Sequence, residues 1–311
     1  MPENFNDLVT KFRNTGPPKH YERTCLRAVE SKEWKELLDK KDNKLDKTRA
    51  ESASAKGAGI WLTQWPSEYL YVLTDNDVLF ALRHRLGLPP HEFFPKDCPF
   101  IATCKKKNIE SDHCHNCRYL RGGVVTDRHN FVVDALGKLV REIGCWWWQE
   151  PRVHDRRTGG SGAATSTYLK KARPDALCSG RTGYWMIDVS IINPTAPSYR
   201  GGSKGRTTHR EKQKHGDYDA VAKTERAVLV PYVLESYGTV GKEARTFIRL
   251  LGKEAADSND IEQHEDPKKI EKQFVSRALR ATSFALQRGN AHVSGQGCAR
   301  MRAAPGARSS T

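Results

Sequence analysis

The chain has 311 residues, which is room for about two domains that each bury a hydrophobic core. Lys and Arg together number 52 against 37 Asp and Glu, so the formal net charge is +15 and the isoelectric point is near 9.5. This charge favours a polyanionic partner, and nucleic acid is the first one to test. Hydrophobic residues make up 37% of the chain and include seven Trp and ten Phe, which excludes a chain that is disordered throughout.

The sequence also excludes membrane and secreted classes. No stretch approaches the roughly 18 uninterrupted apolar residues that a membrane helix needs. The start, Met-Pro-Glu-Asn-Phe-Asn-Asp, has no charged-then-apolar secretion signal. The eight Cys are too few and too unevenly placed for a secreted disulfide framework. We therefore expect a soluble intracellular protein with no membrane partner.

Two segments precede the clearest motifs. Residues 1–57 carry many charges of both signs and end in the small-residue linker Ala-Glu-Ser-Ala-Ser-Ala-Lys-Gly. Residues 58–97 form a helical linker region, in which Thr74 and Asp77 have the spacing of a capping box and Gly87 marks a helix end. The apolar residues between them recur at helical spacing: Val78, Leu79, Leu82 and Leu86.

The second half of the chain alternates helical and strand patterns. An amphipathic helix begins near Phe131 and repeats every three or four residues through Arg141. Short β-branched and aromatic runs predict strands near residues 145–148, 176–177, 184–192 and 227–234. Two further helices are expected at 241–251 and 268–287, and a disordered basic tail at 294–311. This order of elements predicts an α/β core.

Residues 98–117 contain six thiol and imidazole groups that can ligate a metal. In a reducing compartment this density predicts a metal site rather than disulfide bonds. The spacings Cys104-x8-His113 and His113-x3-Cys117 suit a tetrahedral zinc site. We expect Cys98, Cys104, His113 and Cys117 as ligands within a zinc knuckle at residues 98–123. The five residues between Cys98 and Cys104 exceed the usual two to four, and the neighbouring Cys114 and His115 are competing donors. The alternative is a loop of surplus reduced cysteines.

Asp175 and Asp188 form a second candidate metal site. Asp175 ends the sequence Arg173-Pro174-Asp175 before a predicted strand, and Asp188 lies inside an apolar strand, where an uncompensated carboxylate is costly to bury. Two carboxylates on adjacent strands can hold Mg²⁺ or Mn²⁺ with water in its open positions, which is how phosphodiester hydrolysis is promoted. The alternative is an Asp that caps a turn.

Further residues can complete this site. Glu150, after three consecutive Trp residues, can add a carboxylate ligand. A lysine of Arg210-Glu211-Lys212-Gln213-Lys214 can orient the attacking water or offset charge that develops on phosphate. Only position separates Lys212 from Lys214, and the alternative for this segment is a solvated basic helix face.

Short segments between residues 58 and 293 follow one another in a specific order. They are Ile60-Trp61-Leu62, Leu82-Arg83-His84-Arg85-Leu86-Gly87-Leu88-Pro89, Asp112-His113, Arg121-Gly122-Gly123, Arg128-His129-Asn130, Glu150-Pro151, Arg173-Pro174-Asp175, Asp188-Val189, Tyr218 and Ala285-Leu286-Gln287-Arg288-Gly289-Asn290-Ala291. Because these segments follow one another in this order, the chain resembles the restriction-like endonuclease region found downstream of the reverse transcriptase in early-branching non-LTR (LINE-type) retrotransposons.

The resemblance implies a PD-(D/E)XK nuclease core at residues 124–293, a restriction-endonuclease-like mixed sheet flanked by helices and preceded by the zinc knuckle. The family's metal-binding acids would fall on Asp175 and Asp188. Its DNA-binding residues would fall on Arg128, His129, Asn130 and Arg173. The usual lysine two residues after the second acid is Ser190 here, so its role passes to a later helix, and our choice is Lys214.

The resemblance implies a metal-dependent DNA endonuclease, with Mg²⁺ or Mn²⁺ and a structural Zn²⁺, that nicks target DNA for target-primed reverse transcription. DNA is the expected partner, element RNA a further candidate, and a reverse transcriptase an associated protein, in the nucleus rather than the cytoplasm. The chain has no Tyr/Phe-x-Asp-Asp signature and no room for a polymerase domain, so we expect a C-terminal fragment, a truncated product or a domesticated relative. The alternatives are a catalytically decayed zinc-knuckle binding module and, last, a structural protein.

Overall fold

The computed structural model describes Glu36, Asp39 and residues 44–63, 72–92, 94–100, 104, 106–121, 123–151, 173–199, 205–258 and 266–304. The chain divides into two compact units, residues 1–50 and 51–311. Helix α3 (Lys44–Ser54) crosses this boundary in the sequence. The second unit holds the sheet and all of the candidate site residues.

Four strands form one mixed sheet in the order β1-β2-β3-β4. They are β1 (Trp146–Gln149), β2 (Ala176–Ser179), β3 (Tyr184–Ile192) and β4 (Val228–Glu235). The first three strands pair antiparallel, and β3 and β4 pair in parallel. A parallel pair needs a crossover connection, and helix α9 (Arg206–Thr224) provides it. The predicted strands and the α/β class are confirmed.

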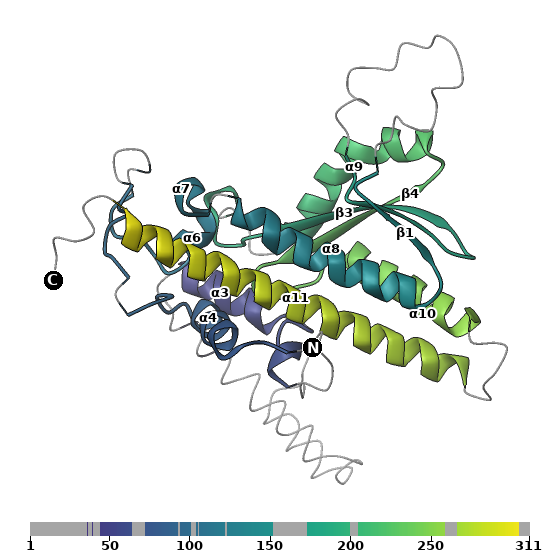
Figure 1. Cartoon of the computed structure of the whole chain (residues 1–311), viewed down its shortest axis with the longest axis horizontal. Helices are drawn as coiled ribbons and strands as arrows, with labels where there is room; N and C mark the ends of the chain where they lie inside the picture. The colour runs from purple at the N-terminus through teal and green to yellow at the C-terminus, as the bar shows by residue number, and fades with distance from the viewer. Residues whose placement is uncertain are drawn as a thin grey trace, which may run out of the picture. The chain divides into compact units, whose positions relative to one another are not determined.

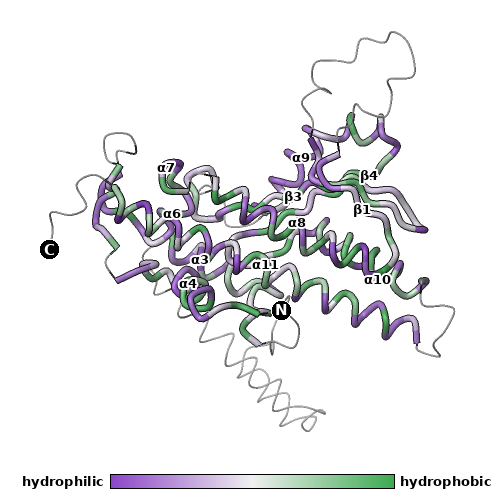
Figure 2. The backbone as a smooth tube through the Cα atoms, in the orientation of Figure 1, coloured by the Kyte–Doolittle hydropathy of each residue, from purple (hydrophilic) through white to green (hydrophobic). Residues whose placement is uncertain are grey.

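The two faces of the sheet pack against different helices (Figure 1). Successive side chains of a strand point to opposite faces. On one face, Trp185, Ile187 and Val189 join the main core with helices α8 (Val124–Glu142), α10 (Lys242–Ser258) and α11 (Pro267–Ala303). On the other face, Met186 packs in a smaller cluster with Val221 of α9. Helix α9 is largely hydrophilic in Figure 2, and Asp188, two residues after Met186, lies on its side of the sheet.

The remaining elements are short, apart from helix α4 (Asp75–Leu86). Its start has the predicted capping box, with Asp77 N donating to Thr74 Oγ1 at 3.2 Å and Thr74 N donating to Asp77 Oδ2 at 3.0 Å. It ends at Gly87, whose φ of 72° is left-handed and therefore suits glycine. The short elements are the 3₁₀ turns η1 (Ile60–Leu62) and η4 (Pro197–Tyr199) and the helices α6 (His113–Asn116) and α7 (Arg118–Arg121).

Helix α11 corrects the expectation of a disordered tail from residue 294. The helix continues to Ala303, and Ser294, Cys298 and Met301 are buried. Small residues permit this close packing, because a Cβ atom at Gly297 would lie 2.7 Å from Cys114 Sγ. A segment of low hydrophobicity can thus be buried because its side chains are small. Residues 305–311 lie outside the described part of the chain. Within the described part, no helix is long and apolar enough to cross a membrane.

Candidate metal centre and active site

The first candidate site is a cluster of three thiols and one imidazole, here called the knuckle cluster: Cys98, Cys104, His113 and Cys117. Their four ligand atoms all lie within 4.8 Å of one another. Cys104 Sγ is 3.6 Å from both His113 Nε2 and Cys117 Sγ. A tetrahedral zinc ion with bonds of about 2.1–2.3 Å has ligand atoms about 3.4–3.8 Å apart. The cluster therefore fits a structural zinc ion with the expected ligands.

Burial sets the protonation of the knuckle cluster. It lowers the pKa of His113 to about 4, with a smaller contribution from the nearby Lys106 charge. Burial also raises the pKa of the Cys98 thiol to about 12, and that of Cys104 shifts in the same direction. The imidazole is thus neutral at pH 7 and ready to ligate. The thiols must lose their protons when a metal binds, so metal affinity is coupled to pH.

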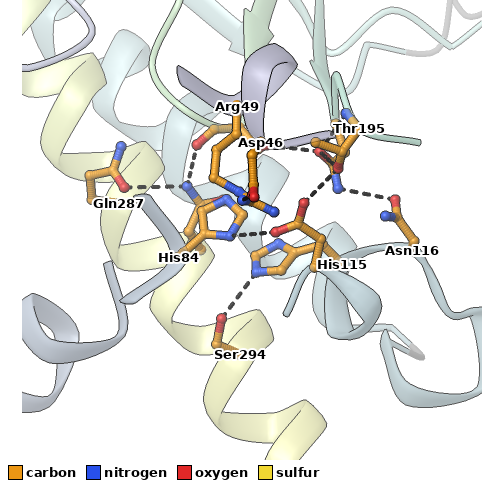
Figure 3. A network of polar contacts seen from close by, with 12 residues as sticks. Asp46, Arg49, His84, His115, Asn116, Thr195, Gln287 and Ser294 are labelled. Carbon is orange, nitrogen blue, oxygen red and sulfur yellow. Dashed lines mark hydrogen bonds and ion pairs between the residues drawn. The ribbon is translucent and has the colours of Figure 1, made fainter. Parts of the chain in front are cut away.

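The two competing donors between the ligands have other partners. His115 Nε2 lies 3.0 Å from Ser294 Oγ, and its ring stacks on that of His84 with centroids 4.2 Å apart (Figure 3). The thiol of Cys114 lies close enough to Cys298 of α11 that this neighbour raises its pKa, together with burial. Both residues therefore attach the knuckle to helices α4 and α11, and neither belongs to the knuckle cluster.

The second candidate site is a cavity of about 560 Å³, here called the acid cavity. Its lining residues come from α8, α9, β3 and the segments that precede β2 and follow β3, and they include Asp175, Asp188, Lys214, Arg173, Arg210 and Tyr218. One wall is formed by His115 and Asn116 of the knuckle. The two aspartates and the lysine that the sequence singled out thus line one space.

Asp188 and Lys214 form the centre of the acid cavity. Lys214 Nζ lies 2.7 Å from Asp188 Oδ2, and the two side chains are 12% and 4% exposed. Burial raises the pKa of the Asp188 carboxyl, the Lys214 charge opposes that rise, and the Asp175 charge adds to it. Lys214 also lies over the ring of Tyr218, with 5.2 Å from Nζ to the centroid. The lysine is therefore held between an acid and an aromatic face.

Asp175 is placed by the register of β2 and β3. It precedes Ala176, which lies opposite Ile187, so the chain brings Asp175 beside Asp188. Its Oδ2 accepts a hydrogen bond from Val189 N at 2.6 Å and lies 3.0 Å from His129 Nε2. Burial is the largest single influence on the pKa of His129 and lowers it, but the hydrogen bonds with Asp175 and Asn130 and the charges of Asp175 and Asp188 together outweigh burial, and the net shift is upward. The two acids thus favour the protonated form of this imidazole.

Two expected residues, Glu150 and Asn130, and the alternative lysine, Lys212, do not line the acid cavity. The side chain of Glu150 is exposed and does not line the cavity, and its contribution is a backbone N–H that donates to Asp175 O at 2.8 Å. Asn130 contacts His129, with 3.2 Å between Oδ1 and Nδ1, and does not line the cavity. Lys212 is exposed on the same helix as Lys214 and does not line the cavity.

Arg128, expected to bind DNA, lines the acid cavity from α8. It is only 3% exposed. Its Nη1 lies 3.3 Å from both His115 Nδ1 and Asn290 Oδ1. The guanidinium therefore braces α8 against the knuckle and α11, whereas Arg173, which also lines the cavity, is exposed.

Polar contacts that the sequence analysis missed join the knuckle to the acid cavity. Asn193 Nδ2 donates to Asn116 Oδ1 at 3.0 Å, and Thr195 Oγ1 donates to Asp112 Oδ2 at 2.7 Å. Within the cavity itself, Arg210 Nε donates to Ser190 Oγ at 3.3 Å. Single Asn, Thr and Ser residues in loops or strands carry no sequence signal for such pairings, because the partners are far apart in the chain.

Comparisons with known proteins add no family. The sequence matches no protein-family model, and no curated protein is significantly similar to it.

Proposed function

We propose that the chain is a metal-dependent DNA endonuclease of the restriction-like type. The observation that carries the proposal is the convergence of Asp175, Asp188 and Lys214 from three separate parts of the chain on one cavity, with Lys214 Nζ 2.7 Å from Asp188 Oδ2. Two acids and a lysine around a partly buried cavity are the groups that metal-assisted phosphodiester hydrolysis needs.

Asp175 and Asp188 would hold the divalent ion, which when bound supplies a hydroxide-like nucleophile and neutralises phosphate charge. The donor set fits, because two carboxylate oxygens are hard ligands and the raised pKa of Asp188 reflects a buried negative charge that a cation would relieve. His129 and Val189 N orient Asp175 through their contacts with Oδ2. Lys214 is placed to stabilise charge on the scissile phosphate.

The cavity also has groups to bind a nucleic-acid backbone. Arg173 and Arg210 add two cations to its lining. The exposed Lys106 and Lys107 lie in the knuckle, which forms one wall of the cavity through Asn116. Together with the net charge of +15, these cations support a DNA substrate whose affinity falls steeply with salt. The resemblance to LINE-type retrotransposon nucleases supports nicking that primes reverse transcription.

The test of this proposal compares two lysines on helix α9. Lys214→Ala is expected to lower the rate of nicking of supercoiled DNA at least 100-fold, while the affinity for DNA changes less than threefold, since its charge acts on the transition state. Lys212→Ala, the matched control, leaves both values near the parent. Equal activity of the two variants would overturn the role of Lys214.

A second candidate function is a binding module that has lost hydrolysis. One observation favours it: within the described ranges, the knuckle cluster is the only group of three or more Cys, His, Asp or Glu side chains close enough to share a metal ion, so no third carboxylate completes the acid pair. A parent protein that binds DNA but nicks none with Mg²⁺ or Mn²⁺ would establish this alternative.

A further inference from the structure

A second concavity lies beside helices α10 and α11, apart from the acid cavity. Its volume is about 620 Å³, and it opens between α10 and α11 beside the turn that precedes η1. Its floor is apolar and consists of Ile60, Val240, Ile248, Val275 and Leu279. Val240 and Ile248 belong to the main core, and Val275 and Leu279 pack against it. The buried apolar residues of α9 belong to the smaller cluster. The two cavities share no lining residue.

The rim of this groove carries only positive charge. Its charged lining residues are Lys56, Lys242, Arg245 and Arg249, and no Asp or Glu lines it. Burial raises the pKa of the Glu211 carboxyl, and Arg245 lies close enough for its charge to oppose that rise. Among the described residues, no ion pair engages Lys56, Lys242 or Arg249, and all three side chains are exposed. The groove therefore combines uncompensated charge with apolar surface.

The spacing of these residues indicates the shape of an occupant. Val275 and Leu279 are four residues apart on α11, and Arg245, Ile248 and Arg249 follow each other at helical spacing on α10. The two helices thus each present one stripe along the groove. Apolar grooves of this kind accept an amphipathic peptide whose anchors recur every three or four residues.

We propose that this groove binds an acidic amphipathic segment of a partner protein, with apolar side chains on the floor and carboxylates against Lys56, Lys242 and Arg249. A nucleic-acid backbone would meet the same cations but would leave the apolar floor without a partner. An uncharged apolar peptide would leave the cations uncompensated. Only a ligand that has both features matches the groove.

The test selects peptides without bias toward charge. A displayed library of random 16-residue peptides is panned on the full chain, with and without the charge reversals Lys242→Glu and Arg249→Glu combined. Binders to the parent are expected to carry several Asp or Glu around two or more Leu, Ile, Phe or Trp. Enriched peptides that lack acids, or no enrichment at all, would overturn the proposal.

Affinity measurements then locate the site. A fluorescent copy of the best peptide is expected to bind the double variant at least tenfold more weakly than the parent, since two cations are lost. Lys253→Glu, an exposed change on α10 outside the groove, is the control and keeps the parent affinity. A 20-nucleotide single strand should not displace the peptide. Displacement by that strand, or equal affinity for both variants, would contradict the assignment.

Discussion

Lys214 Nζ of helix α9 lies 2.7 Å from Asp188 Oδ2 of strand β3. The pair is nearly buried, and burial raises the pKa of Asp188 while the ammonium of Lys214 opposes that rise. Breaking a buried ion pair by removing one partner leaves the other charge uncompensated, which is more costly than losing the pair as a whole. The stability of the fold and the chemistry proposed for the acid cavity therefore depend on the same contact.

The first prediction concerns stability in the absence of divalent metal. Lys214→Met is expected to lower the free energy of unfolding at pH 8 by about 3 kcal/mol, because Asp188 stays charged and buried. A raised pKa in the folded state means that protonation favours folding, so the deficit relative to the parent should shrink as the pH falls toward 5. Urea unfolding at both pH values, with chelator present, measures it. A deficit that grows on acidification would contradict the pairing.

The second prediction concerns zinc. Purified protein is expected to carry about one zinc ion per chain, and His113→Ala to lose most of it, since the knuckle cluster would keep only three ligands. His115→Ala should retain the zinc and lose about 1–3 kcal/mol of stability, because it removes a buried partner of Arg128 and Ser294. Metal analysis and thermal unfolding separate the two variants. Equal zinc loss in both would contradict the ligand set.

The third prediction tests the packing at the end of α11. Gly297→Ala is expected to destabilise the fold by about 1–3 kcal/mol, since the added Cβ would lie 2.7 Å from Cys114 Sγ. Gly295→Ala is the matched control, because its nearest neighbour, Phe80, is 3.6 Å away. The control should gain up to about 1 kcal/mol from helix propensity. A stabilising effect of Gly297→Ala would show that residues 294–303 do not pack as described.

Local patterns in the sequence predicted much of the fold. The Thr74 and Asp77 capping box, the amphipathic helix through Arg141 and the strand at residues 184–192 are each determined by residues within one turn or one strand. The spacing of Cys104, His113 and Cys117 likewise allowed the residues of the knuckle cluster to be predicted. These features depend on near neighbours in the chain, so the sequence displays them directly.

Features that depend on tertiary packing could not be predicted in this way. Only position along the chain separated Lys214 from Lys212, because the rotation of α9 against the sheet decides which side chain meets Asp188. Arg128 was expected to bind DNA, and no local pattern indicated that the knuckle and α11 would bury its guanidinium. The tail from Ser294 was expected to be disordered because its many small residues give it low hydrophobicity. Low hydrophobicity hides the fact that the segment is buried through close packing.

The central claim is that Asp175 and Asp188 hold the ion that activates water for DNA cleavage. The most direct measurement is the nicking of supercoiled DNA by the parent, Asp175→Ala and Asp188→Ala with Mg²⁺, Mn²⁺ or chelator, alongside DNA affinity. We expect the parent to nick DNA only with divalent metal, and both variants to lose nicking while they retain DNA binding. Nicking by both variants at the parent rate would contradict it.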